Sequence, residues 1–237
     1  MHVIHDAAVD ARHAAAKLSA TVRTPRGAAS PTGHVVLGGA LVYVPTGYRA
    51  DRPGGLLVMF HGAGGTSQQA IGFVQAAAEQ ERFIVVAPKA AASSWDCVHG
   101  GFGPDVAQLD RALQAVFEEY AVDPARIAVG GFSDGASYAL TIGLANGALF
   151  RAVLAYSPGF EMAPRRSGRP RIFISHGVAD RVLSIDATSR RLRPTLEHHG
   201  YPVEYVEFAG GHAIPDPVLA ASMTWWLRTP IPTPTSR

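Results

Sequence analysis

The sequence contains a Gly-x-Ser-x-Gly pentapeptide, Gly131 to Gly135, with Ser133 at its centre. An apolar run, 126–130, precedes it and a helix-forming run, 136–146, follows it. Strand, pentapeptide and helix in this order are typical of a nucleophile elbow, a sharp turn that exposes a reactive serine hydroxyl. A side chain at either glycine would collide with the neighbouring strand or helix, so we expect both glycines to be required. The start of the following helix favours negative charge beside Ser133.

Two groups that could activate Ser133 follow predicted strands later in the chain. Asp180 comes after the strand predicted for 171–175, and His212 comes after the strand predicted for 203–208. A serine hydroxyl is a poor nucleophile at neutral pH and needs a base within hydrogen-bond reach. A histidine, with an ordinary pKa of about 6.5, can be that base. Asp180 would fix the tautomer of His212 and stabilise the imidazolium, so the sequence predicts a Ser133–Asp180–His212 triad.

Other acids and histidines are weaker candidates for these roles. Asp186 is expected one turn into the next helix, facing away from the strand end, and Asp216 is too close in sequence to reach the ring of His212 easily. Asp134 lies inside the elbow and is expected to point away from the hydroxyl. The remaining histidines suit other roles: shaping the acid loop (His176), ending a helix (His198 and His199) or touching substrate from a glycine-rich loop (His99).

A glycine-rich segment, His61-Gly-Ala-Gly-Gly65, directly follows the apolar run 56–60. Its small residues allow backbone N–H groups to turn towards the serine, and such donors contribute about 3–4 kcal/mol each to stabilising an oxyanion. We expect the amides of Ala63 and Asp134 to form this oxyanion hole, with Gly64 as the alternative to Ala63. A phosphate-binding loop is the other interpretation of the glycines. It is excluded for nucleotides because neither Gly-Lys-Ser/Thr nor Gly-x-Gly-x-x-Gly is present there.

Alternating strands and helices are needed to bring these groups together. Apolar runs bounded by turn residues predict strands at 34–39, 40–44, 56–60, 83–87, 126–130, 152–156, 171–175 and 203–208. Periodicity, caps and prolines predict helices over 1–20, 66–78, 104–120, 136–146, 184–199 (bent or interrupted at Pro194) and 215–228. Continuous apolar runs belong to strands buried on both faces. The pattern therefore predicts an α/β fold, a mostly parallel sheet with helices on both faces, and a site at the carboxyl ends of the strands.

The domain organisation predicted from the sequence is simple. Residues 34–228 form one domain, preceded by an extension of a short helix and a loop, 1–33, and followed by a proline-rich tail, 229–237. A hydrophobic content of 47% and a charged content of 17% are enough for a sizeable core in 237 residues. We find no internal repeat and no linker long enough to divide the chain.

Composition also excludes several classes of function. A formal net charge of +2 without a dense Lys/Arg cluster gives no electrostatic case for nucleic-acid binding. The single cysteine, Cys97, excludes an intrachain disulfide, and no Cys/His zinc spacing is present. The sequence has no apolar run of about 18 residues, and the N-terminal segment lacks the apolar region of a signal peptide. We therefore expect a cytoplasmic protein without a membrane span, and no bound metal.

With these motifs in this order, the chain resembles small α/β-hydrolases of the serine carboxylesterase/phospholipase-like group, with affinities to polyhydroxybutyrate-depolymerase-like and feruloyl-esterase-like proteins. Ser, Asp, His is the chain order of their triads. The resemblance covers about residues 40–228 and rests on these segments: 41–45, 60–65, 105–110, 122–126, 131–135, 176–180 and 211–212. It implies hydrolysis of carboxylic esters without a metal or organic cofactor. Only the segment Ser157 to Arg169 connects two strands where many relatives carry a lid, so we expect an open site with little or no lid.

The residues expected to line the pocket bear on the substrate. Segments 61–66, 93–103 and 157–163 are expected to form the pocket walls, with an apolar lining for an acyl or aryl group contributed by Trp95, Phe102, Phe160 and Met162. Trp95 could equally be a loop residue pinned on the surface. The resemblance thus predicts a serine carboxylesterase for short-chain or aromatic esters, with a small-molecule ester as its partner. A thioesterase, acyltransferase or peptidase with the same triad, or a hydrolase-fold protein that only binds ligands, are the alternatives.

Overall fold

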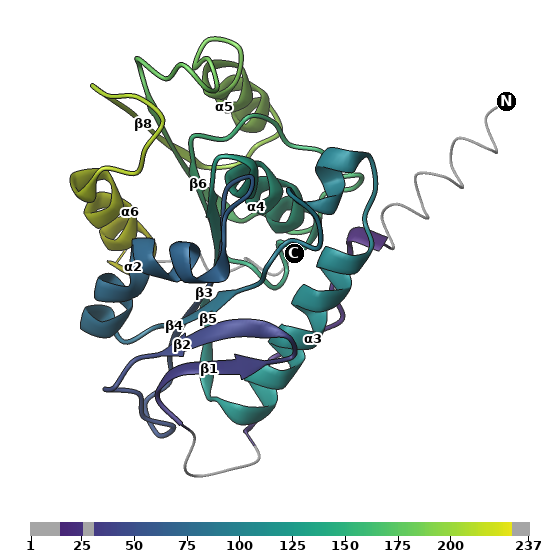
Figure 1. Ribbon diagram of the computed structural model, residues 1–237, viewed down its shortest axis with the longest axis vertical. Helices are drawn as coiled ribbons and strands as arrows, with labels where there is room; N and C mark the ends of the chain where they lie inside the picture. Colours follow the sequence, from purple (N-terminus) through teal and green to yellow (C-terminus); the bar gives the residue numbers. More distant parts are fainter. Residues whose placement is uncertain (1–14, 26–30, 229–237) are drawn as a thin grey trace, which may run out of the picture.

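The computed structural model of the chain describes residues 15–25 and 31–228 (Figure 1). Its centre is a single sheet of eight strands, in the order β1-β2-β4-β3-β5-β6-β7-β8. The strands pair in parallel from β4 through β8, whereas β1 and β2 add antiparallel neighbours at one edge. The bounds are β1 Gly33–Leu37, β2 Ala40–Val44, β3 Gly54–Phe60, β4 Ile84–Ala87, β5 Val122–Phe132, β6 Ala152–Tyr156, β7 Arg171–Gly177 and β8 Val203–Phe208. The predicted mostly parallel sheet is therefore confirmed.

Helices cover both faces of the sheet, as predicted (Figure 1). Helices α2 (Ser67–Glu81) and α6 (Asp216–Arg228) pack on one face, where their apolar residues join the second buried cluster of the domain. Helices α3 (Pro104–Glu119), α4 (Asp134–Ala145) and α5 (Ser189–His198) pack on the other face. A short 3₁₀ helix, η1 (Asp96–His99), lies in the loop between β4 and α3. No helix lies between β6 and β7, which fits the expected absence of a large cap.

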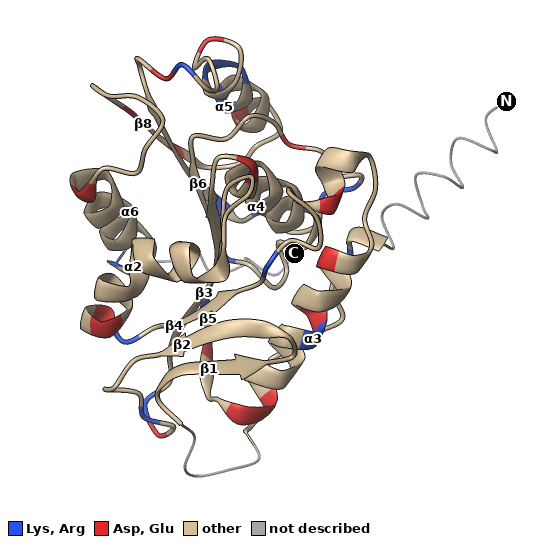
Figure 2. Cartoon of the chain, in the orientation of Figure 1, with Lys and Arg blue, Asp and Glu red and all other residues tan. Residues whose placement is uncertain are grey.

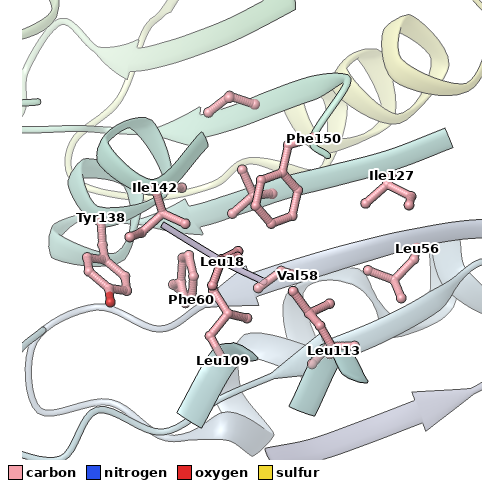
Figure 3. Close-up of a cluster of buried hydrophobic side chains, with 14 of the residues drawn as sticks. Leu18, Leu56, Val58, Phe60, Leu109, Leu113, Ile127, Tyr138, Ile142 and Phe150 are labelled. Atoms are coloured by element: carbon pink, nitrogen blue, oxygen red, sulfur yellow. The ribbon is translucent and has the colours of Figure 1, made fainter. Parts of the chain in front are cut away.

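The larger buried cluster fills the space between the sheet and α3 and α4 (Figure 3). Val58 and Phe60 of β3 meet Leu109 of α3 and Ile142 of α4 there, all without exposed surface. Leu18, from the N-terminal segment, is also buried in this cluster. The segment 15–25 therefore packs against the domain. Residues 1–14 and 229–237, where the sequence predicts most of a helix and a tail, lie outside the described residues.

Local signals in the sequence set several element boundaries. The two-residue turn Gly38-Gly39 joins β1 to β2 with φ of 56° and 86°, values that glycine adopts without steric cost. Thr66 caps α2: its hydroxyl accepts from the Gln69 amide, and the Gln69 side chain accepts from the Thr66 amide. Pro104 opens α3 at its first turn. The hairpin and both helix starts confirm the predictions.

The predicted helix over 184–199 is wrong at its start. Helix α5 begins only at Ser189, and the preceding residues form turns. The reason is local hydrogen bonding, since the amides of Ala187 and Thr188 donate to the carbonyl oxygens of Ser184 and Ile185, three residues earlier, and form turns instead of an α-helix. Asp186 consequently lies in an exposed turn, paired with Arg190, rather than inside the helix. Pro194 lies inside α5 and does not interrupt it.

Charged residues of both signs are distributed over the described part of the chain. Figure 2 shows acidic residues spread over several helices with Lys and Arg between them, consistent with the net charge of +2. Across residues 15–25 and 31–228, no helix is both long and apolar enough to cross a membrane.

Candidate active site

The chain reverses its direction of strand addition at β3. From β3 it passes outwards to β4, and it then returns to place β5 on the other side of β3. The loops that leave the carboxyl ends of β3 and β5 therefore diverge and leave a crevice between them, the place where open α/β sheets bind ligands. The glycine-rich segment follows β3, and Ser133 follows β5.

Ser133 occupies a strained turn between β5 and α4. Its φ of 58° and ψ of −122° are unusual for a residue with a side chain. The glycines on either side permit this geometry: a Cβ on Gly131 would lie 2.2 Å from the carbonyl oxygen of Gly135, and a Cβ on Gly135 would lie 2.4 Å from that of His61. The expected collisions at both positions are confirmed, and the turn has the strain typical of functional serines.

Asp180 and His212 are hydrogen-bonded to each other. His212 Nδ1 donates to Asp180 Oδ2 at 2.6 Å, although 32 residues separate them in the chain. The other carboxylate oxygen accepts from the amides of Val182 (2.8 Å) and Leu183 (2.9 Å). Burial acts to raise the pKa of Asp180, but the hydrogen bonds from Leu183, His212 and Val182 outweigh it, so the pKa lies below its usual value. The carboxylate is therefore ready to stabilise a charged His212.

The ring of His212 also contacts the residue that precedes Ser133. This residue is Phe132, and its ring centroid lies 4.7 Å from that of His212. Within the described residues, no hydrogen bond joins the Ser133 hydroxyl to His212. Ser133 donates its backbone amide to the carbonyl oxygen of Tyr156, which fixes the turn against β6. The structure thus brings all three predicted residues to one edge of the sheet. The predicted hydrogen bond between Asp180 and His212 is formed, and the one between His212 and Ser133 is not.

His176 contacts the Asp180 carboxylate and the loop that carries it. Its ring is fully buried, with Nε2 2.9 Å from the carbonyl oxygen of Leu183 and 3.1 Å from Asp180 Oδ2, and with Nδ1 2.7 Å from Ser189 Oγ. Because a carbonyl oxygen only accepts, Nε2 carries the proton and donates to it. The prediction that His176 shapes the acid loop agrees with these contacts, which link β7, the Asp180 loop and α5.

Replacing His176 by alanine is expected to lower the free energy of unfolding by about 2–4 kcal/mol, because the substitution leaves the Leu183 carbonyl and the Ser189 hydroxyl without a buried partner and opens a cavity. Urea unfolding monitored by circular dichroism measures the change. His99, which is exposed, offers a matched control, since His99→Ala should change stability by less than about 0.5 kcal/mol. Equal stabilities of the two variants would contradict a supporting role for His176.

The glycine-rich segment after β3 is held rigidly. His61 Nε2 accepts from the Ala90 amide at 3.1 Å, which leaves Nδ1 to donate to the Gly62 carbonyl at 2.7 Å. Burial lowers the pKa of His61, which favours this neutral tautomer. Trp95 adds a further constraint, because its indole N–H donates to the His61 carbonyl oxygen at 3.0 Å.

The backbone amides near Ser133 differ in their availability. The amide of Gly64 donates to the carbonyl oxygen of Ser93 at 2.7 Å. The amides of Ala63 and Asp134 have no acceptor within the part of the chain that the structure describes. The side chain of Asp134 accepts from the Ser94 hydroxyl at 2.6 Å and so is already engaged, in agreement with the expectation that it points away from the Ser133 hydroxyl. The Ala63 amide is therefore available to an incoming acceptor, whereas the Gly64 amide is not.

The four aromatic or apolar residues expected to line a pocket occupy different environments. Trp95 has no exposed surface: its ring stacks on Tyr138 with centroids 4.9 Å apart and belongs to the core. It cannot line an open pocket, and its role is to brace the His61 loop. Phe102 and Phe160 are half-buried against the larger cluster, and Met162 is exposed. These three remain available to a substrate on the α4 side of Ser133.

A cavity on the opposite side of Ser133 is lined in part by the predicted wall segment 61–66, but its extension along α2 was not anticipated from the sequence. It has a volume of about 510 Å³ and lies between the glycine-rich segment, the first turns of α2 and the end of β5. We call it the α2 cavity; its lining residues are His61, Gly62, Ala63, Gly64, Gly65, Gln69, Gly72, Phe73 and Phe132. The position of Phe132 inside the elbow was a usable signal, but nothing in the sequence indicated that Gly72 and Phe73 of α2 face the same space.

Cys97 is buried in the η1 segment. Burial, together with the nearby carboxylates of Asp96, Asp134 and Asp105, raises the pKa of its thiol to about 12. Such a thiol is not a nucleophile at neutral pH and has a packing role. No cluster of three or more His, Cys, Asp or Glu side chains suited to a metal ion is present in the described ranges.

Comparisons with known proteins point to esterases. No protein-family model matches the chain. The chain is 24% identical over 202 residues to feruloyl esterase C of Emericella nidulans, an alignment that covers 71% of this chain and 74% of that enzyme. It shares its fold with esterase PE8 (TM-score 0.65, 21% identity, 81% of this chain and 98% of the other) and with the carboxylesterase of Bacillus cereus (TM-score 0.59, 20% identity, 79% and 93%). These similarities support a hydrolase that acts on esters.

Proposed function

We propose that this chain, an esterase-like protein of the α/β-hydrolase fold, hydrolyses carboxylic esters through an acyl-enzyme on Ser133. The observation that carries the proposal is the hydrogen bond from His212 to Asp180, next to a serine held in the strained elbow geometry. A pure binding protein needs neither the bond nor the strain. Similarity to feruloyl esterase C supports an ester as the substrate.

In the proposed mechanism, His212 Nε2 takes the proton of the Ser133 hydroxyl as Oγ attacks the ester carbonyl. Asp180 holds the proton on Nδ1 and stabilises the imidazolium. The amides of Ala63 and Asp134 donate to the carbonyl oxygen as it becomes negative. His212 then gives its proton to the departing alcohol, and a water molecule activated by the same ring hydrolyses the acyl-enzyme. The Ser133–His212 hydrogen bond would form with substrate, since catalytic hydrogen bonds are often long in free enzymes.

The acyl group of the substrate is proposed to be short or aromatic. The segment between β6 and β7 carries no helical cap, and Ser137 and Thr141 of α4 hold it close to the domain through the amides of Gly159 and Met162. Phe160, on this segment, and Phe102 supply apolar surface beside the elbow. With this segment held close to α4, we expect the acyl side to favour short or aromatic groups over long acyl chains. A clear preference for acyl chains of twelve carbons or more would contradict it.

Hydrolysis of 4-nitrophenyl esters from acetate to laurate tests the proposal, together with labelling by a serine-reactive phosphonate. We expect turnover of the short esters and a single phosphonate adduct on Ser133, located by mass spectrometry. Faster reaction with matched thioesters, or acyl transfer to added alcohols, would instead indicate a thioesterase or an acyltransferase. A folded chain that neither turns over esters nor reacts with the phosphonate would be a binding protein.

The pH dependence of kcat/KM is expected to reflect the loss of a single proton, from the base that activates Ser133. Because hydrogen bonds hold the pKa of Asp180 below its usual value of about 3.9, Asp180 stays ionised from about pH 5 upwards. The proposed base must be unprotonated to accept the Ser133 proton, so kcat/KM should rise with pH to a plateau, and Asp180 does not contribute to this rise. Log kcat/KM should therefore rise with unit slope to a plateau and become steeper only below the ordinary carboxyl range, because the pKa of Asp180 is lowered.

Initial rates at substrate concentrations well below KM, measured in buffers of constant ionic strength, give this profile. A flat profile between pH 5 and 9 would contradict His212 as the base. A slope of two within that range would show instead that Asp180 and His212 titrate together.

A further inference from the structure

The α2 cavity is lined by residues that contact Ser133 and His212. Gly62, in its wall, lies against the nucleophile: a Cβ on Gly62 would be 3.4 Å from Ser133 Cβ. Phe132, in the opposite wall, has its ring against that of His212, at 4.7 Å between centroids. A ligand in this cavity would therefore contact the immediate neighbours of Ser133 and His212, although these two residues are not themselves among the described residues that line it.

The position of His212 decides which half of an ester would fit there. His212 must protonate the departing alcohol oxygen, so the group on that oxygen lies on the histidine side of Ser133. Both α2 and α6 pack on the same face of the sheet, and His212 lies on the loop that leads into α6 (Figure 1). The α2 cavity opens on this face, whereas Phe160 and Met162 lie on the α4 side. The acyl half and the alcohol half would thus occupy opposite faces.

The lining of the cavity selects an apolar, flat group. Two aromatic rings, Phe73 and Phe132, stand 5.7 Å apart with 57° between their planes, and glycine backbone forms much of the remaining wall. No Asp, Glu, Lys or Arg is among the described residues that line it. His61 uses both ring nitrogens within its own loop, and the Gln69 oxygen is used in capping α2. Few polar groups remain for a hydroxyl-rich alcohol, whereas 510 Å³ readily holds one aromatic ring.

We propose that the α2 cavity binds the alcohol half of the substrate and takes an apolar group of about the size of a benzyl ring. The proposal rests on the proposed ester hydrolysis at Ser133, and it adds the second half of the substrate to the acyl half discussed above. Aromatic rings packed against Phe73 and Phe132 gain from burial and from ring-to-ring contact.

Two isomeric esters distinguish binding of the alcohol group from binding of the acyl group. Benzyl acetate carries its ring on the alcohol and methyl phenylacetate carries it on the acyl group, and the two esters have the same molecular formula. Gly72→Leu is the informative variant, because a Cβ at this position in α2 meets no atom within 4 Å and the leucine side chain would extend into the cavity. Leucine also favours the helix over glycine, so the variant should fold. Ala76→Leu, one turn further along α2 and outside the cavity lining, is the matched control.

We expect Gly72→Leu to lower kcat/KM for benzyl acetate, relative to kcat/KM for methyl acetate, by at least about tenfold. The same ratio for methyl phenylacetate should change less than about threefold. Ala76→Leu should leave both ratios as in the wild type. A selective loss of methyl phenylacetate hydrolysis would assign the cavity to the acyl group and overturn the proposal, as would unchanged ratios. If the wild type hydrolyses none of the three esters, the proposed function fails first.

Binding provides a readout that does not depend on turnover. Benzyl alcohol should bind to the Ser133→Ala chain, observed by saturation-transfer NMR, and adding Gly72→Leu should abolish the signal. Equal signals from the two chains would place the alcohol elsewhere and overturn the assignment even where ester hydrolysis is intact.

Discussion

Ser133→Ala is expected to lower kcat for 4-nitrophenyl acetate by about 10⁴–10⁶-fold, the range seen when a triad nucleophile is removed. The substitution deletes the atom that forms the acyl-enzyme but leaves the elbow intact, since alanine needs only the same φ of 58° that serine already tolerates. The proposed oxyanion donors would remain, so some rate above that in water should persist. Initial-rate kinetics with active-site titration of the wild type measures the difference.

Two controls are needed to assign this result to Ser133. Ser184→Ala, at an exposed position in the turns before α5, removes the same atom elsewhere and should keep wild-type kinetics. Circular dichroism and urea unfolding of Ser133→Ala should match those of the wild type, which would exclude misfolding as the cause. Retention of more than about a tenth of the wild-type kcat would contradict Ser133 as the nucleophile and direct attention to water attack assisted by His212 and Asp180.

The fold was largely predictable because its signals are local. Each of the buried strands reads as a continuous apolar run, and the turn at Gly38-Gly39 and the cap at Thr66 are fixed by residues within a few positions. The order Ser133, Asp180, His212 was also readable, because each residue directly follows a strand, and parallel strands bring such loops to one edge. The Asp180–His212 hydrogen bond is the consequence in three dimensions.

The pocket could not be predicted in the same way because it depends on contacts between distant segments. The ring of Trp95 is buried because Phe60 of β3 and Tyr138 of α4 meet it, and neither is near it in the sequence. The α2 cavity lies between the segment 61–65, α2 and the end of β5, and Gly72 borders it with space for a larger side chain. The start of α5 was misplaced for another reason, since residues 184–188 form turns through i to i−3 hydrogen bonds from the amides of Ala187 and Thr188.

Gly135→Ala is expected to destabilise the chain strongly, because it adds a methyl group where the backbone of β3 leaves no space. Its Cβ would lie 2.4 Å from the His61 carbonyl oxygen and 2.5 Å from that of Phe60, both backbone atoms at the end of β3. Backbone atoms of a central strand cannot rotate away as a side chain can, so α4 would have to move. We expect a loss of about 3 kcal/mol or more in the free energy of unfolding, from urea unfolding curves.

The same movement should also lower activity, because α4 carries the Asp134 amide and the His61 loop carries the Ala63 amide. Separating the two would widen the proposed oxyanion hole, and misplacement by about 1 Å can cost a hundredfold in rate. Gly72→Ala is the matched control: it adds the same methyl group to a helical glycine that has nothing within 4 Å, and should stabilise the chain by up to about 1 kcal/mol. If both alanine variants were equally stable, the close approach of α4 to β3 would not constrain the elbow, and the need for glycine beside Ser133 would have another cause.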